Sequence, residues 1–133
     1  MNKKILRAIE ISRALRPQKQ SGKNFHCSFG FLRSKIVGIG WNSYDESHLE
    51  HKFGKYHPTR GGENYNAGRH SETQLLRRLK ISTKDLTIIN VRVGYKGEIL
   101  MARCCLNCER VLREKGFKKL LYTITETEFG VLE

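Results

Sequence analysis

The chain has 133 residues, of which 38% are hydrophobic, and its 25 Lys and Arg against 13 Asp and Glu give a formal net charge of +12. This length suits one domain with a sizeable core, and the apolar content argues against a disordered chain. No stretch approaches the ~20 apolar residues of a membrane span, and the N-terminus lacks the long apolar run of a signal peptide. We therefore expect residues 1–133 to form a single cytoplasmic domain, whose four cysteines suit a reducing compartment.

The positive charge is concentrated near the N-terminus, where Glu10 is the only acidic residue among the first 35. Such a field favours partners that carry phosphate, from a mononucleotide to RNA or DNA. A solvated helix face followed by a basic tail explains the same charge equally well. The charge alone does not separate a nucleotide from a nucleic acid.

The first third of the chain predicts a helix followed by a β-hairpin. Apolar residues recur at helical spacing over residues 3–15, and Pro17 is expected to end that helix. Residues 25–31 alternate in character, with Phe25, Cys27, Phe29 and Phe31 on one side and His26, Ser28 and Gly30 on the other. Residues 35–41 provide the second strand of the hairpin. Cys27 lies on the apolar side and is expected to be a small core residue.

Residues 43–69 are polar, rich in Gly, His and Tyr, and show no clear period. A loop of this length in a compact domain is usually functional or disordered, and this one could wall a site between Asn42 and His70. Its histidines are His48, His51 and His57. A second, structural zinc is one interpretation of them, but no cysteine accompanies them and surface histidines are favoured. His26, alone on its strand, is likewise expected to be structural.

The second half of the chain predicts alternating helices and strands. In order, these are a helix over residues 70–80, a strand over 86–93, a returning segment over 98–102, a helix over 108–115, and strands over 118–123 and 129–132. The connection between the last two strands is too short for the crossover that parallel neighbours require, so these strands should pair antiparallel. We therefore predict a three-layer α/β/α fold, with a mixed sheet of about five strands and the two later helices on one face.

The residues that carry chemistry are His70, Glu72, Cys105 and Cys108. An imidazole, a carboxylate two positions later and a downstream C-x-x-C pair of thiols are the parts of a catalytic zinc site. His70, Cys105 and Cys108 supply three ligands and leave a fourth tetrahedral position for water, whereas a structural site would need four protein ligands. Glu72 would lie beside that water without binding the metal, placed to move protons.

This set resembles the zinc-dependent cytidine/deoxycytidylate deaminase superfamily, whose signature is H-x-E followed by P-C-x-x-C. The resemblance covers roughly residues 3–125 and implies a cytidine deaminase-like fold. It implies that His70, Cys105 and Cys108 bind Zn²⁺ and that Glu72 is the proton shuttle. One position departs from the family's pattern, because a third cysteine stands immediately before the C-x-x-C pair where the family has proline.

The resemblance also implies where the substrate binds. Residues 38–42 resemble the family's second strand, whose terminal asparagine, here Asn42, contacts the sugar or phosphate side of the substrate. Trp41 and Ser71 are the other expected substrate contacts, with Trp41 a candidate for stacking on the base. Cys104 replaces the family's proline, which suits a helix start, and adds a thiol within reach of the metal.

The implied activity is hydrolytic deamination of a cytosine nucleoside or nucleotide, with cytidine, deoxycytidine, CMP and dCMP all open, to the uracil form and ammonia. The alternatives are a cytosine or adenine deaminase acting on RNA or single-stranded DNA, an inactive member that binds nucleic acid, and a structural zinc protein. The short C-terminus favours a small pyrimidine substrate, while the charge of +12 favours a phosphorylated one. We expect no membrane partner, and a homo-oligomer is an open expectation because nucleoside-type relatives tend to complete their sites across subunits.

Overall fold

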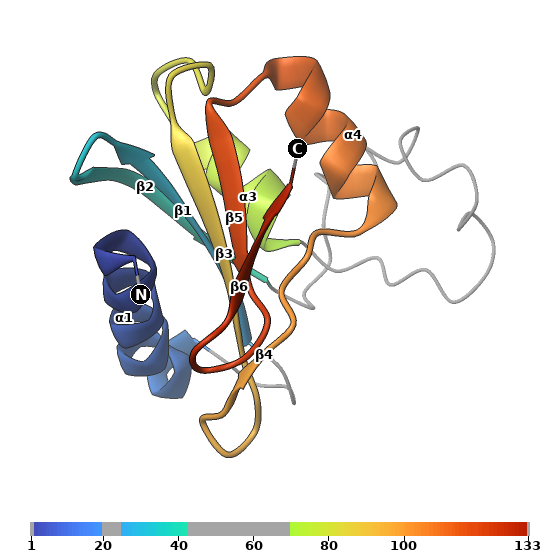
Figure 1. Ribbon diagram of the computed structural model, residues 1–133. Coiled ribbons are helices and arrows are strands. Elements are labelled where there is room, and N and C mark those ends of the chain that lie inside the picture. The colour runs from blue at the N-terminus through green and yellow to red at the C-terminus, as the bar shows by residue number, and fades with distance from the viewer. Residues whose placement is uncertain (1, 20–24, 43–69, 133) are drawn as a thin grey trace, which may run out of the picture.

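The computed structural model describes residues 2–19, 25–42 and 70–132 (Figure 1). Its elements are α1 (Lys3–Lys19), β1 (Phe25–Leu32), β2 (Lys35–Trp41), α3 (Ser71–Arg78), β3 (Thr87–Val93), β4 (Ile99–Leu100), α4 (Leu106–Lys115), β5 (Lys119–Thr123) and β6 (Phe129–Leu132). None of the described helices is long and apolar enough to cross a membrane. The expectations for residues 43–69, including a second zinc at His48, His51 and His57, lie outside the described residues.

A mixed sheet forms the middle layer, in the order β2-β1-β3-β5-β6, and the short β4 pairs with β3. β1 pairs antiparallel with both β2 and β3, whereas β3 and β5 run parallel and are joined through β4 and α4. β6 pairs antiparallel with β5, from Leu120 opposite Leu132 to Thr123 opposite Phe129. The prediction that the last two strands are antiparallel is therefore confirmed.

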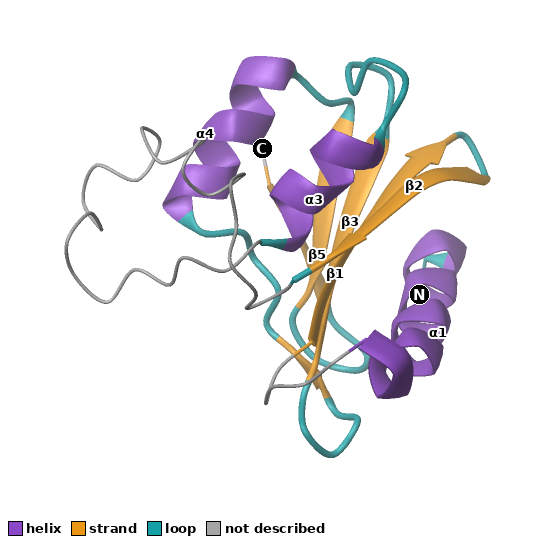
Figure 2. Cartoon of the chain, turned by 180° about the vertical axis from the view of Figure 1, so that it is seen from behind, coloured by secondary structure: helices purple, strands orange, loops and turns teal. Residues whose placement is uncertain are grey.

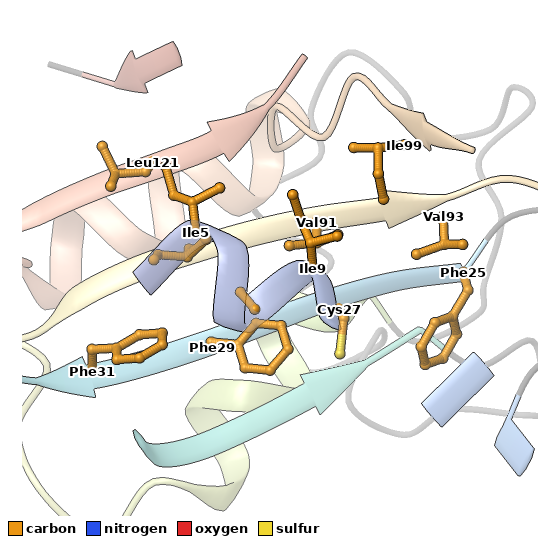
Figure 3. Packing of buried hydrophobic residues seen from close by; sticks show 12 residues of the cluster. Ile5, Ile9, Phe25, Cys27, Phe29, Phe31, Val91, Val93, Ile99 and Leu121 are labelled. Atoms are coloured by element: carbon orange, nitrogen blue, oxygen red, sulfur yellow. The ribbon is translucent and has the colours of Figure 1, made fainter. Parts of the chain in front are cut away.

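The helices lie on opposite faces of this sheet, α1 on one and both α3 and α4 on the other (Figure 2). The core under α1 is built from Ile5, Ala8 and Ile9 of the helix packed on the aromatic side of β1. Figure 3 shows Ile5 and Ile9 of α1 over the sheet, in the cluster that also holds Phe29 of β1 and Val91 of β3. The alternation read in residues 25–31 is confirmed, and the three-layer α/β/α prediction with it.

The face under α3 and α4 carries a second apolar cluster, in which Leu75, Leu112 and Ile88 pack together. Gly40 of β2 lets α3 lie directly on the sheet, because a Cβ at this position would overlap the backbone of Ser71 and Leu75. This close approach holds the start of α3 against the polar side of β1 and β3. The sheet thereby becomes the floor of the site described below.

Three helix ends differ from the predictions by two residues or more. α1 continues past Pro17 to Lys19, so the expectation that Pro17 ends the helix is wrong. A proline near a C-terminus removes one hydrogen bond from the last turns, while its fixed φ remains compatible with a helix. α3 ends at Arg78 rather than residue 80, and α4 begins at Leu106 rather than residue 108.

Candidate metal and catalytic site

The predicted ligands lie at the N-termini of the two helices that share one face of the sheet. His70 is the N-cap residue of α3, and Cys105 is the N-cap residue of α4, each with an extended backbone. Cys108 lies in the first turn of α4, where its backbone N–H donates to the Sγ of Cys105 at 3.5 Å. The Cys105 thiol therefore occupies the capping position that a serine or aspartate oxygen often fills. The cap explains why α4 begins immediately after Cys105.

The three side chains converge closely enough to hold one metal ion. The Nδ1 of His70 lies 3.2 Å from the Sγ of Cys108 and 3.6 Å from the Sγ of Cys105. All three ligand atoms lie within 4.8 Å of one another. A tetrahedral zinc with ordinary Zn–N and Zn–S bonds would separate such nitrogen and sulfur atoms by about 3.5 Å. One imidazole and two thiols at these distances fit zinc.

The surroundings favour thiolate at Cys105. Hydrogen bonds from Cys108 and His70 lower the pKa of Cys105 to about 3, against the opposing effect of burial. The partial positive charge at the N-terminus of α4 also favours the thiolate form of Cys105. Cys104, in contrast, is buried in the apolar cluster beneath the helices, and burial raises its pKa. The structure thus groups Cys105 and Cys108 with His70, and Cys104 does not join this set among the described residues.

Glu72 lies in the first turn of α3, with only 7% of its surface exposed. Burial raises the pKa of its carboxyl group, and the charge of His70 opposes that shift. Both carboxyl oxygens are hydrogen-bonded. Oε2 accepts from the Nδ2 of Asn90 at 3.0 Å, and Oε1 lies 3.2 Å from the Oγ of Ser71. The carboxyl group is therefore held in one orientation two residues after the candidate ligand His70.

Ser28 closes these contacts into a ring of four buried side chains. Its Oγ lies 2.8 Å from the Oγ of Ser71 and 2.7 Å from the Oδ1 of Asn90. The members come from β1, β3 and α3, so three separate elements fix the position of Glu72. Because Asn90 Oδ1 can only accept, the Ser28 hydroxyl turns toward it, and the Asn90 amide nitrogen must then face Glu72.

The protons in this ring can be counted. Three of its four contacts join two oxygen atoms, so each of the three needs one hydroxyl or carboxyl proton. Ser28 and Ser71 supply only two such protons. One contact therefore lacks a proton while Glu72 is ionised. When Glu72 carries a proton, it donates to Ser71, Ser71 to Ser28, Ser28 to Asn90, and Asn90 back to Glu72. The ring accommodates the protonated acid completely.

The three residues expected to contact substrate are Asn42, Trp41 and Ser71, and each of them makes contacts within the protein. The Oδ1 of Asn42 accepts a hydrogen bond from the backbone N–H of His26 at 3.0 Å, and this contact fixes the end of β2 against β1. Trp41 packs at the margin of the α1 core, and the guanidinium of Arg78 lies 4.0 Å from its ring centroid. Ser71 belongs to the ring around Glu72.

Two residues of the ring were not identified from the sequence, Asn90 and Ser28. Asn90 is a polar residue inside the otherwise β-branched run of β3, and it is 2% exposed. Ser28 is on the polar side of the alternation in β1 and is fully buried. Buried polar residues inside strands were the available signal, because such groups require partners.

Comparison with known proteins shows that this chain is similar in fold to a solved structure. No family model and no curated protein matches the sequence. A crystal structure of cytidine deaminase from Mycobacterium leprae is similar, with a TM-score of 0.54 and 16% sequence identity, and the match covers 94% of this chain and 90% of that chain. At this identity the likeness concerns the fold alone. The α/β architecture, with three described helices and a mixed six-stranded sheet, is a cytidine deaminase-like fold.

Proposed function

We propose that this protein is a zinc-dependent hydrolytic deaminase that converts a cytosine nucleoside or nucleotide to its uracil form and releases ammonia. One observation carries the proposal: three side chains that could hold a metal ion lie beside a buried carboxyl group, that of Glu72, two residues after His70. A fold shared with a cytidine deaminase supports it. In this proposal His70, Cys105 and Cys108 hold the zinc.

Zinc with three protein ligands leaves one position for water and lowers the pKa of that water toward ~7. The chain's own contribution is Glu72. Its carboxylate takes a proton from the attacking water and delivers it to the ring nitrogen, while the water oxygen bonds to the carbon that bears the exocyclic amine. Glu72 then carries the second proton of the water to the amine. The carbon–nitrogen bond breaks, ammonia leaves, and the ring carbon keeps the oxygen.

Glu72 must hold its position through both proton transfers, and the ring of side chains around it suits this task. Asn90 and Ser71 contact its two oxygens, so the carboxyl group cannot rotate freely between the transfers. The ring also satisfies the protonated form, in which Glu72 carries each proton from the water to the substrate. We therefore assign Ser71 a positioning role through Glu72, because both of its contacts in the ring are already made.

A structural zinc protein would have no use for Glu72. Burying a carboxyl group is unfavourable unless it is hydrogen-bonded, and a site that only holds metal gains nothing from placing one there. The buried, oriented carboxyl therefore favours catalysis over a structural role. Asn42, at the end of β2, is the residue that we propose contacts the sugar or phosphate side of the substrate.

The test is conversion of cytosine to uracil compounds by the zinc-loaded protein, followed by ultraviolet absorbance. The substrates are cytidine, deoxycytidine, CMP, dCMP, a cytosine-containing single strand and the matching adenine compounds. Glu72→Gln, which keeps the size of the side chain, is the control. Conversion of a cytosine monomer that the variant lacks supports the proposal. Conversion of the single strand alone would show that the substrate is a polynucleotide and not a small molecule. Conversion of adenine compounds alone would overturn the cytosine assignment.

A further inference from the structure

Arg92 lies on the floor of the candidate site. It follows Asn90 by two residues along β3, so its side chain leaves the sheet on the same face as that of Asn90. This is the face that α3 and α4 cover, since Asn90 contacts Glu72 and Ile88 packs in the cluster beneath those helices. Two residues of a strand span roughly 6.6 Å. Arg92 is therefore one short step along the sheet from the residue that holds Glu72.

His26 connects Arg92 to the candidate metal ligands. It is the cross-strand partner of Arg92 in the pairing of β1 with β3. Burial, together with the positive charges of Arg92 and His70, lowers the pKa of His26 to about 4, and the charge of Cys105 opposes this shift. His26 therefore lies near Arg92 and near two of the candidate metal ligands, His70 and Cys105. At neutral pH its ring is uncharged, so Arg92 supplies the positive charge of this floor.

Within the described part of the chain, the guanidinium of Arg92 has no acidic partner. Its Nε is buried and makes no hydrogen bond, and no ion pair of the described residues includes it. Arg13, which is exposed, instead has the two carboxyl oxygens of Glu126 as partners. An arginine, unlike a lysine or histidine, cannot relieve burial by losing its proton. A partly buried arginine with an unused donor beside a candidate active site is suited to an anion from outside the chain.

We propose that Arg92 binds the phosphate of the substrate and that the substrate is accordingly a mononucleotide, CMP or dCMP, rather than a nucleoside. A guanidinium offers parallel N–H donors that match the oxygens of a phosphate. Asn42, bonded to the backbone of His26, borders the same part of the sheet. The inference rests on the proposed function, because it names the substrate class of that site. The same phosphate chemistry could come from a polynucleotide backbone, which the experiment separates.

The first experiment compares kcat/KM for dCMP and for deoxycytidine in the zinc-loaded protein. Wild type should prefer dCMP. Arg92→Gln should reduce the ratio of the two kcat/KM values roughly 10- to 100-fold, as expected for loss of a charge-assisted hydrogen bond. Arg110→Gln is the matched control, an exposed arginine on α4, and should leave the ratio unchanged. A wild-type preference for deoxycytidine, or an equal loss on both substrates in Arg92→Gln, would overturn the proposal.

A binding measurement separates this inference from the proposed function. Calorimetric titration of the zinc-loaded Glu72→Gln protein with dCMP and with deoxycytidine needs no turnover. If the Glu72→Gln protein binds dCMP more tightly than deoxycytidine, and the Glu72→Gln/Arg92→Gln double variant does not, the phosphate site is supported. This result would hold even if no cytosine compound is deaminated. Equal binding of the two compounds contradicts it. Adding a cytosine-containing single strand as a third ligand identifies the source, since tighter, Arg92-dependent binding of the strand would overturn the assignment to a mononucleotide.

Discussion

Replacing Glu72 with glutamine tests the ring of buried side chains directly. The amide nitrogen of the new side chain would donate to Ser71, and its oxygen would accept from Asn90, so every contact of the ring would have its proton. Ionised Glu72 leaves one contact without a proton. One buried hydrogen bond contributes about 1 kcal/mol, and relief of a poorly satisfied buried group adds to it, so we expect a gain of about 1–2 kcal/mol in the free energy of unfolding at neutral pH.

The gain should depend on pH in a defined direction. The pKa of Glu72 is raised in the folded protein above its ordinary value of 4.5, so the stability associated with its protonated form is present below that value. That stability is lost as the pH rises through the folded pKa. The variant has no such group, and its advantage over wild type should be nearly zero in acid and should grow as the pH rises above 4.5.

Thermal unfolding of the chelator-treated proteins, followed by circular dichroism between about pH 4 and pH 8, measures this difference. A gain of that size raises the Tm of a chain of this length by about 3–8 °C. Glu10→Gln, an exposed substitution of the same kind on α1, is the control and should show no such trend. If the Glu72→Gln protein is less stable than wild type at neutral pH, or if the difference does not depend on pH, the proton count of the ring is wrong.

Five further substitutions, used in three experiments, test other parts of the site and its packing. Asn90→Ala removes a donor from Glu72 and should lower kcat about 10- to 100-fold, measured beside an unchanged zinc content; a loss of zinc instead would show that Asn90 serves the metal site. Gly40→Ala should destabilise the fold by about 1–3 kcal/mol, because α3 must shift, whereas at Gly38 the nearest atom to a Cβ belongs to a flexible leucine, so Gly38→Ala should cost less in the same unfolding assay. Cys105→Ser should lose the metal and Cys104→Ser should keep it, by metal analysis of the purified proteins; the reverse result would move the ligand to the other thiol.

Local pattern was enough to predict the layers of the fold. Alternation in residues 25–31 identified the buried side of β1, and Cys27 is fully buried there as expected. The short connection before β6 was enough to predict its antiparallel pairing. These features depend on neighbours in sequence, which is why a single sequence reveals them. The end of α1 was predicted wrongly, because a proline near the C-terminus of a helix removes one hydrogen bond and does not stop the chain.

The surroundings of Glu72 could not be predicted in the same way. Ser28 and Asn90 meet because β1 pairs with β3, and that register joins residues far apart in the chain. The same register brings His26 beside Arg92. Side-chain partners across a sheet depend on which strands pair and on their offset, and local periodicity reports neither. The motif thus predicted that His70, Cys105 and Cys108 converge. The register of β1 with β3 shows which residues lie around Glu72 and this group.

The most direct test of the proposed deaminase is a titration of zinc into the metal-free protein, with ammonia release from cytidine, deoxycytidine, CMP and dCMP measured at each step. Activity should rise with zinc and saturate at one zinc for each chain. Glu72→Gln should bind the same amount of zinc without releasing ammonia. Activity in the metal-free protein, or full zinc loading without ammonia from any cytosine compound, would contradict the proposed deaminase.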